Sequence, residues 1–531
     1  MDIAAEEEAI RELQTLRNAS SPISKLPTRL IPRIFFLAKL VSIEERFATH
    51  RYCAPDSKAR NWLNVAGVCR TWRKIVLDAP SLWNNLDLRE IRHLDWAKLI
   101  LARSKGASLQ VKCTGSKREH ALLSIVLEHI SDIQVLNITT DISHFTELQK
   151  IIKARTANIS LINLRSLNLN NSTYRTTTKL RKALLHAPFL QKLELSGICI
   201  PSSIPPLPQL RRLRISSISS GSKNEGMPMT ALLSCLLNTP SLEELEVDNA
   251  LGKVGRKKDR TTVRLPKLSW ISLTSDHVAN STLFQHIHYP ASARIKFHST
   301  TEPPRGSDIR NLTAIFSHFA TSDAAMQINT LFLVYHPTLR RQEEVTLIAT
   351  SRGVRYLNIS CATLERDVLP LTRLSALLPC ISIKTLHVGG SPKIKRADWT
   401  NLLKLYENTR ILEAEDVAPS FLEALLKSPE DEWPPLAEVE EVQLHGCHFD
   451  SPYSNPSLTP CIKKLLQERN DLEIPFDVVG ISDCYILEST VEELEEHDVR
   501  IDWDEETLQK EEEEEEEEED DDAEYWKERY Y

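Results

Sequence analysis

The sequence predicts an α/β chain in three parts: a small helical domain, a solenoid of short parallel strands and helices, and a disordered acidic C-terminal tail. Three observations predict this organisation. A short apolar motif recurs along most of the 531 residues, residues 24–90 show a different, helical pattern, and residues 502–524 carry 17 acidic side chains and one lysine. The rest of the chain has seven more basic than acidic side chains, so the tail produces the net charge of −9.

The composition excludes several classes of protein. With 41% hydrophobic and 26% charged residues, the chain is neither disordered throughout nor collagen-like. Its 14 glycines beside 28 prolines argue against glycine-rich phosphate-binding loops. The start, MDIAAEEEAI, is acidic where a secretory signal is basic, and Pro32, Arg33 and Lys39 interrupt the most apolar early stretch. We therefore expect a protein that is neither exported nor inserted in a membrane.

No catalytic or metal-binding pattern is visible. The ten cysteines form no CxxC pair and lie mostly in apolar runs, which favours buried thiols in a reducing compartment. His277, His286 and His288 cluster, but no acidic or cysteine ligand stands at metal-binding spacing. GxSxG and HExxH motifs are absent from the sequence. The sequence therefore predicts no enzyme activity, no metal and no cofactor, and a location in the cytoplasm, the nucleus or both.

Residues 1–23 are predicted to form an amphipathic helix and a linker. Between residues 5 and 17, Ile10, Leu13 and Leu16 recur at helical spacing among charged residues. This stretch is too short for a coiled coil.

The next domain, residues 24–90, is predicted to contain one long helix between Asn61, as its N-cap, and Pro80. Trp62, Val65, Cys69, Trp72 and Val76 would form one apolar stripe of that helix. An earlier amphipathic segment would cover the stripe; its apolar residues are Leu30, Ile31, Ile34, Phe35 and Leu37. Such a short domain has a marginal core, so we expect apolar side chains left over for a partner.

Residues 91–448 contain a repeated motif in which apolar residues occupy the first, fourth and sixth positions. Its copies are IQVLNI (133–138), LRSLNL (164–169), LQKLEL (190–195), LRRLRI (210–215), LEELEV (242–247), LSWISL (268–273), INTLFL (328–333), VRYLNI (354–359), IKTLHV (383–388), TRILEA (409–414) and VEEVQL (439–444), with a weaker ARIKF at 293–297. The central residues, from Leu136 to Val442, are 20 to 36 residues apart, most often 26. Each copy predicts a short strand.

Helices are predicted between the copies, where leucines at helical spacing precede a proline, at residues 177–188, 229–240, 371–379 and 418–429. A strand and a helix repeated at this period bury their apolar faces by stacking. The pattern resembles the leucine-rich-repeat family, which implies parallel strands on a concave face and helices on a convex face. An ordinary doubly wound α/β domain would need longer and fewer apolar strands. Residues 449–501 would form the C-terminal cap, and residues 502–531 the tail.

Residues 24–87 resemble the F-box family. Its ordered elements appear here as Leu26-Pro27, Leu30-Ile31, Ile34-Phe35, Val68-Cys69-Arg70, Trp72-Arg73, Pro80 and Leu82-Trp83. The chain departs from the family at Arg29, where an acidic residue is usual, at Pro32, early in the first helix, and at residues 42–60, an insertion like that of fungal F-box-like sequences. The alternative, a segment that only caps the solenoid, explains the apolar stripe but not the ordered motifs.

The resemblance implies that the chain is the substrate-recognition subunit of an SCF-type cullin ubiquitin ligase. The F-box would dock on the Skp adapter, and the repeats would hold an unknown protein substrate. The implied adapter-binding residues are Leu26, Pro27, Leu30, Ile31, Ile34, Phe35, Val68, Cys69, Trp72, Leu82 and Trp83. The alternative is a non-ligase leucine-rich-repeat binding protein, or a chaperone for basic proteins, that acts through its acidic tail.

The substrate surface is predicted from strand alternation, because residues between the core leucines would face the concave side. Their charges are of both signs, which argues against nucleic acid as a ligand. The candidate substrate-binding residues are Lys192, Arg212, Arg214, Trp270, Phe332 and Tyr356. The acidic tail would be attracted to the basic strands and would partly limit access to them; the alternative is a tail that only makes the chain more soluble and contacts nothing. The basic insertion at residues 249–264 fits a nuclear-import signal or a contact for an acidic ligand; the alternative is a solvated loop with no partner.

Overall fold

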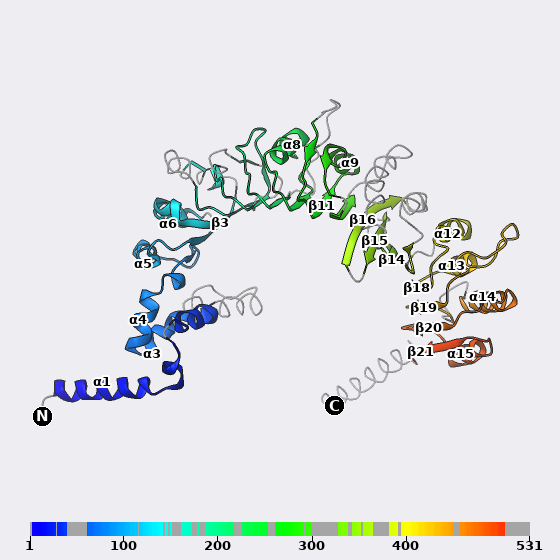
Figure 1. Cartoon of the computed structure of the whole chain (residues 1–531), viewed down its shortest axis with the longest axis horizontal. Coiled ribbons are helices and arrows are strands. Elements are labelled where there is room, and N and C mark those ends of the chain that lie inside the picture. Colours follow the sequence, from blue (N-terminus) through cyan, green and yellow to red (C-terminus); the bar gives the residue numbers. More distant parts are fainter. Residues whose placement is uncertain are drawn as a thin grey trace, which may run out of the picture. The chain divides into compact units, whose positions relative to one another are not determined.

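The computed structural model describes residues 3–27, 29–39, 61–114, 116–141, 144–146, 149–150, 161–172, 178–180, 186–216, 226–252, 261–290, 292–299, 328–337, 342–351, 354–364, 382–390, 394–450 and 457–504. The chain divides into two compact units, Met1–Lys253 and Val254–Tyr531 (Figure 1). Both units combine helices with parallel strands. In the described part of the chain, none of the helices has the length and apolar character needed to span a bilayer.

The first unit begins with a helical region. Its elements are α1 (Ile3–Ala19), η1 (Pro22–Lys25), a helix over residues 31–39, η2 (Asn61–Asn64), α3 (Val65–Val68), α4 (Arg70–Asp78) and η3 (Pro80–Leu82). The helix α1 confirms the predicted N-terminal amphipathic helix. Pro32 is the second residue of the helix over residues 31–39, where its missing N–H group leaves no hydrogen bond unmade.

The prediction of one long helix after Asn61 is wrong. The chain leaves the helical conformation at Cys69, whose φ of −156° and ψ of 168° are extended. The Cys69 sulfur accepts a hydrogen bond from the backbone N–H of Trp72 at 3.4 Å and so caps α4. Gly67, just before the break, weakens the preceding turn because glycine has low helix propensity.

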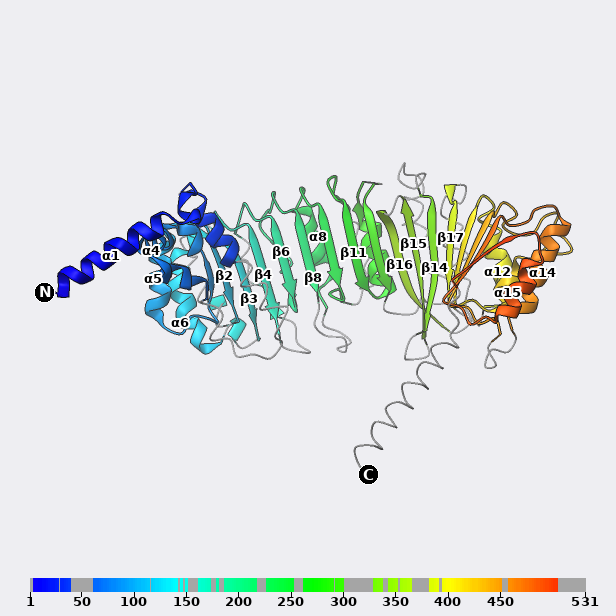
Figure 2. The same cartoon turned by 90° about the horizontal axis from the view of Figure 1, so that it is seen from below.

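A parallel sheet forms the rest of the first unit. Its strands pair in the order β1 (Asn85–Asp87), β2 (Leu109–Cys113), β3 (Ile133–Thr140), β4 (Ser166–Asn171), β6 (Lys192–Ser196), β8 (Arg212–Ser216) and β9 (Glu244–Asp248) (Figure 2). Other elements are α5 (Leu94–Ser104), α6 (Lys117–Val126), η4 (Leu127–Asp132), α8 (Met229–Leu237) and the parallel pair β5 (Thr178–Lys179) and β7 (Ile198–Cys199). Because β1 pairs with β2, the sheet begins inside the predicted domain of residues 24–90.

Central motif residues of this sheet lie in register and are buried. Leu136, Leu167, Leu193, Leu213 and Leu245 pair across neighbouring strands. Side chains on the opposite face of the same strands remain partly accessible. We call this second face, in either unit, the open face.

The second unit also contains a sheet with mostly parallel strands. Its strands are β11 (Trp270–Ser275), β13 (Arg294–Ser299), β14 (Thr330–Pro337), β15 (Gln342–Ser351), β16 (Val354–Leu364), β17 (Thr385–Gly389), β18 (Ile411–Glu415), β19 (Glu441–His445), β20 (Val478–Ser482) and β21 (Arg500–Trp503), beside a short pair, β10 (Val263–Arg264) and β12 (Ile287–His288). Its helices are α9 (His277–His286), α12 (Arg396–Leu403), α13 (Pro419–Ala424), α14 (Thr459–Asp471) and α15 (Glu488–Glu495). Figure 1 shows α12 to α15 on one side of strands β18 to β21.

The strand β15 departs from the predicted parallel series. It is antiparallel to both β14 and β16, and the strand order is β13, β16, β15, β14, β17. The connections before and after β15 span residues 338–341 and 352–353. Parallel neighbours need a crossover of a dozen or more residues, so these short connections permit only antiparallel pairing.

The remaining sequence predictions have mixed outcomes. The helix α8 confirms the helix at 229–240, whereas α13 is shorter than its predicted segment. The predicted helix at 177–188 begins instead with β5, and the one at 371–379 lies outside the described residues, as does the insertion at 42–60. Strand β21 continues to Trp503, two residues into the predicted disordered tail; from residue 505 onward the tail lies outside the described residues.

Candidate functional site

The helix over residues 31–39 has two apolar stripes with opposite exposure. Ile31, Phe35 and the stem of Lys39, four residues apart, face inward and are buried. Leu30, Ile34 and Leu37 recur at intervals of four and three residues and are 39%, 37% and 54% exposed. Since both stripes carry large apolar side chains, this segment has a second apolar face that the described residues of the domain leave exposed.

Aromatic side chains fill the core beneath this helix. The rings of Phe35 and Trp72 lie 4.9 Å apart, which joins the helix to α4. The Trp83 ring contacts Trp62 at 5.4 Å and Trp96 of α5 at 6.1 Å. The Trp83 indole Nε1 donates a hydrogen bond to the carbonyl oxygen of Val76 at 2.7 Å. These rings hold the helical region together and attach it to the first helix beside the sheet.

Lys39 is a buried cation in the same core. Its Nζ donates a hydrogen bond to the carbonyl oxygen of Leu82 at 2.8 Å and lies 4.7 Å from the centre of the Trp62 ring. Burial lowers the pKa of Lys39 to about 8, although the charge of Glu90 opposes this shift. Lys39 therefore joins the helix to the segment after α4 at the cost of desolvating its ammonium group.

The structure divides the predicted adapter-binding residues into two groups. Ile31, Phe35, Leu82 and Trp83 are buried, and Cys69 and Trp72 are half-buried in contacts that form the domain itself. The residues that remain exposed are Leu26, Pro27, Leu30, Ile34 and Val68. The buried four build the core of the domain, whereas the exposed residues are accessible to a partner, and adapter binding by any of these residues stays a prediction. Leu37, named above among the apolar residues of this segment, is missing from the predicted adapter-binding set, although its spacing from Leu30 and Ile34 places it on the same stripe.

The predicted basic substrate residues lie together on the open face of the first unit, but each faces a carboxylate. The Lys192 Nζ lies 2.8 Å from a Glu194 oxygen, and an Arg212 nitrogen donates to Glu244 at 2.7 Å. Arg214 lies 3.2 Å from Glu246. The strand register places these pairs on β6, β8 and β9. This surface is therefore charge-compensated, which weakens the expectation that it attracts the acidic tail.

The predicted aromatic substrate residues do not form one cluster. Trp270 of β11 lies against Arg294 of β13, with 5.9 Å between the guanidinium carbon and the ring centre. Phe332 of β14 lies beside His387 of β17, with 5.0 Å between ring centres. Strands β13, β16 and β15 separate β11 from β14. The side chain of Tyr356 lies outside the described residues.

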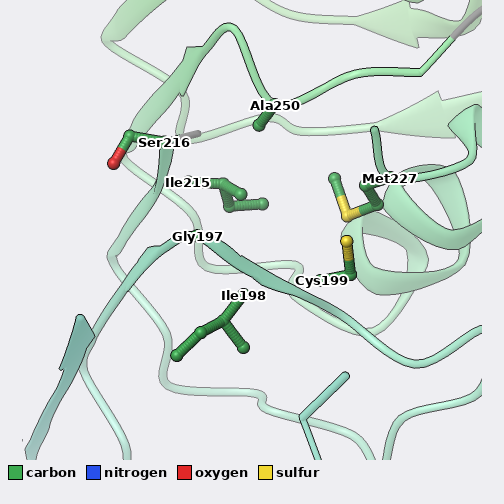
Figure 3. A pocket seen from close by; sticks show the side chains of 7 residues that line it. All are labelled: Gly197, Ile198, Cys199, Ile215, Ser216, Met227 and Ala250. Atoms are coloured by element: carbon green, nitrogen blue, oxygen red, sulfur yellow. The ribbon is translucent and has the colours of Figure 1, made fainter. Parts of the chain in front are cut away.

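The described residues also include one small pocket in the first unit (Figure 3). Ile198, Cys199, Ile215, Met227 and Ala250 contribute apolar or weakly polar surface, and the Ser216 hydroxyl points away from the group. This lining has no acid, base or activated nucleophile. No cluster of three metal-binding side chains occurs within the described ranges.

Comparison with known families matches one segment of the chain. The F-box-like family model matches residues 23–89, the segment that contains both apolar stripes and the core rings of Phe35, Trp62, Trp72 and Trp83. No curated protein matches the chain in sequence. The chain therefore carries an F-box-like domain at residues 23–89, and F-box domains typically bind the Skp adapter of SCF ubiquitin ligase complexes.

Proposed function

We propose that the chain is the substrate-recognition subunit of an SCF-type cullin ubiquitin ligase and has no catalytic activity of its own. The F-box-like domain docks on the Skp adapter, and the strand array, as a leucine-rich-repeat solenoid, holds the substrate protein. The exposed stripe of Leu30, Ile34 and Leu37 is the observation that carries this proposal.

The physical reason is the cost of leaving this stripe in water. Burying one leucine or isoleucine side chain contributes about 1.5 to 3 kcal/mol. Three such side chains on one helical face, with Leu26 and Val68 exposed in the same domain, form a surface that gains from a partner. Among the described residues of the domain, Phe35 and Trp83 fill the interior, and the outer stripe remains exposed.

Three further observations support the assignment of the strand array and the compartment. The twelve motif copies coincide with strands whose apolar rows lie in register, and α12 to α15 lie on one side of their strands. The described cysteines are free thiols, as in a reducing compartment such as the cytoplasm or nucleus.

The test is binding of the Skp adapter to the full chain, measured by isothermal titration calorimetry. The double variant Leu30→Ala/Ile34→Ala is expected to weaken binding at least about 30-fold, because two anchors lose about 2 kcal/mol or more. The control is Leu237→Ala, which removes the same side-chain atoms as Leu30→Ala alone, at a leucine of α8 that is 53% exposed. The proposal would be overturned if the unmodified chain did not bind the adapter. It would also be overturned if Leu237→Ala weakened adapter binding as much as the double variant does.

A further inference from the structure

We infer that the open face of the neighbouring strands β15, β14, β17, β18 and β19 binds an extended segment of a partner protein. In this segment, an apolar residue is followed by lysines or arginines. This inference deepens the proposed function, since the segment would belong to the substrate. Two neighbouring zones on one face carry it: an apolar zone on β15 and β14, and an acidic zone on β18 and β19.

The apolar zone follows from the strand register. Ile348 of β15 pairs with Phe332 of β14, which in turn pairs with His387 of β17. Val334 follows two residues later on the same side of β14 and is also half-buried. These side chains alternate with the buried Leu331 and Leu333, so they face away from the core. A partner side chain can cover the Phe332 ring from the open side.

The acidic zone begins at the next strand. The two ring nitrogens of His387 lie 3.0 Å from an oxygen of Glu413 and 3.5 Å from an oxygen of Glu415. Glu441 of β19 accepts a hydrogen bond from the Gln443 side chain at 2.7 Å. In the described part of the chain, these three carboxylates form no ion pair with a lysine or arginine.

In the first unit, carboxylates on the open face do form ion pairs with lysine and arginine side chains. There Glu194, Glu244 and Glu246 occupy the corresponding open face, and each lies against a lysine or arginine. The carboxylates of β18 and β19 lack that compensation among the described residues. A basic ligand would supply the missing cations, and it would gain apolar contact with Phe332 from the same approach.

Strand spacing sets the pattern of the ligand. Neighbouring strands lie about 4.8 Å apart, so Glu413 is about 10 Å and Glu441 about 14 Å from Phe332 across the sheet. An extended chain rises about 3.3 Å per residue. A segment laid across the strands therefore places a basic residue about three to five positions after the apolar one. The acidic C-terminal sequence of this chain has the wrong sign to occupy the surface.

The probe is a fluorescein-labelled peptide with one leucine followed, about three to five residues later, by arginines in a glycine and serine background. Fluorescence anisotropy with the full chain should show saturable binding that weakens as salt rises. The triple variant Glu413→Gln/Glu415→Gln/Glu441→Gln is expected to bind at least about 10-fold more weakly, and Phe332→Thr about fivefold more weakly, because several surface pairs and one apolar contact are lost.

Two control variants make the result specific. Glu244→Gln/Glu246→Gln removes carboxylates that are already paired, and its affinity should stay within about twofold of the unmodified chain. Replacement of Glu511–Glu519 by glutamine tests the acidic sequence as the binding element. The inference is overturned if the unmodified chain shows no saturable binding, if the triple variant binds normally, or if either control loses as much affinity as the triple variant.

Adapter binding is measured on the same preparations. Loss of peptide binding with normal adapter binding in the triple variant supports the surface and shows that the variant is folded in its F-box-like domain. Peptide binding by a chain that does not bind the Skp adapter would overturn the ligase proposal while supporting this surface.

Discussion

The F-box-like domain and the neighbouring sheet of the first unit differ in how completely they bury their large apolar side chains. In the sheet, the motif leucines are buried in rows, and the open face carries polar residues with paired charges. In the domain, one helix buries Ile31 and Phe35 while its other stripe leaves Leu30 and Ile34 exposed. In a sheet built from stacked repeats, each repeat buries the apolar residues of its neighbours. A small domain buries one apolar stripe, and the other remains exposed for a partner to cover.

The sharpest test of this comparison uses two adjacent residues. Phe35→Ala is expected to destabilise the helical region by about 3 to 5 kcal/mol, because it removes a buried ring that contacts Trp72. Ile34→Ala should change the same quantity by less than about 1 kcal/mol, because Ile34 is exposed. Hydrogen exchange of backbone amides in α4 reports both values. Equal effects of the two substitutions would show that the two stripes do not differ.

A second prediction concerns the buried cation of the domain. Because burial lowers the pKa of Lys39 from 10.5 to about 8, the folded domain holds this proton less tightly than the unfolded chain. Its free energy of unfolding should therefore rise between about pH 8 and pH 10.5, by at most about 3 kcal/mol, and this gain is lost as pH falls through 8.

The variant Lys39→Met isolates that contribution. Urea unfolding of the full chain is measured at several pH values, with hydrogen exchange of the α4 amides as the probe. The free energy of unfolding should rise with pH in the unmodified chain and should rise less in the variant. The sheet offers an internal control, because protection of β6 and β8 should have the same pH dependence in both proteins. Matching pH profiles for α4 in the two proteins would contradict the prediction.

The smallest expected effect lies on the open face of the first unit. Arg214 and Glu246 are both partly exposed, so their ion pair should contribute no more than about 0.2 to 1 kcal/mol and should weaken in salt. A double-mutant cycle with Arg214→Gln and Glu246→Gln measures this coupling. A coupling well above about 1 kcal/mol at high salt would indicate a desolvated pair. The contrast with Glu413, Glu415 and Glu441, which have no lysine or arginine partner among the described residues, would then need revision.

The candidate site was predictable as a segment but not as a surface. The ordered motifs from Leu26 to Trp83 identify the F-box-like domain, because they occur at fixed places along the chain. The same motifs do not separate Phe35, which is buried, from Ile34, which is exposed. Both are large apolar residues of one helix, and which stripe faces inward depends on the position of α4 and its Trp72 ring.

Sequence alone determined the strands that the repeated motif specifies, from β3 at Ile133–Thr140 to β19 at Glu441–His445, and the alternation of buried and accessible residues along them. Periodicity is a local property, so it survives without knowledge of neighbours. Only the tertiary structure decided the antiparallel insertion of β15 and the pairing of Arg212 with Glu244, 32 residues away. Strand order and cross-strand charge pairing depend on which segments become neighbours in space, and the motif is the same in every copy.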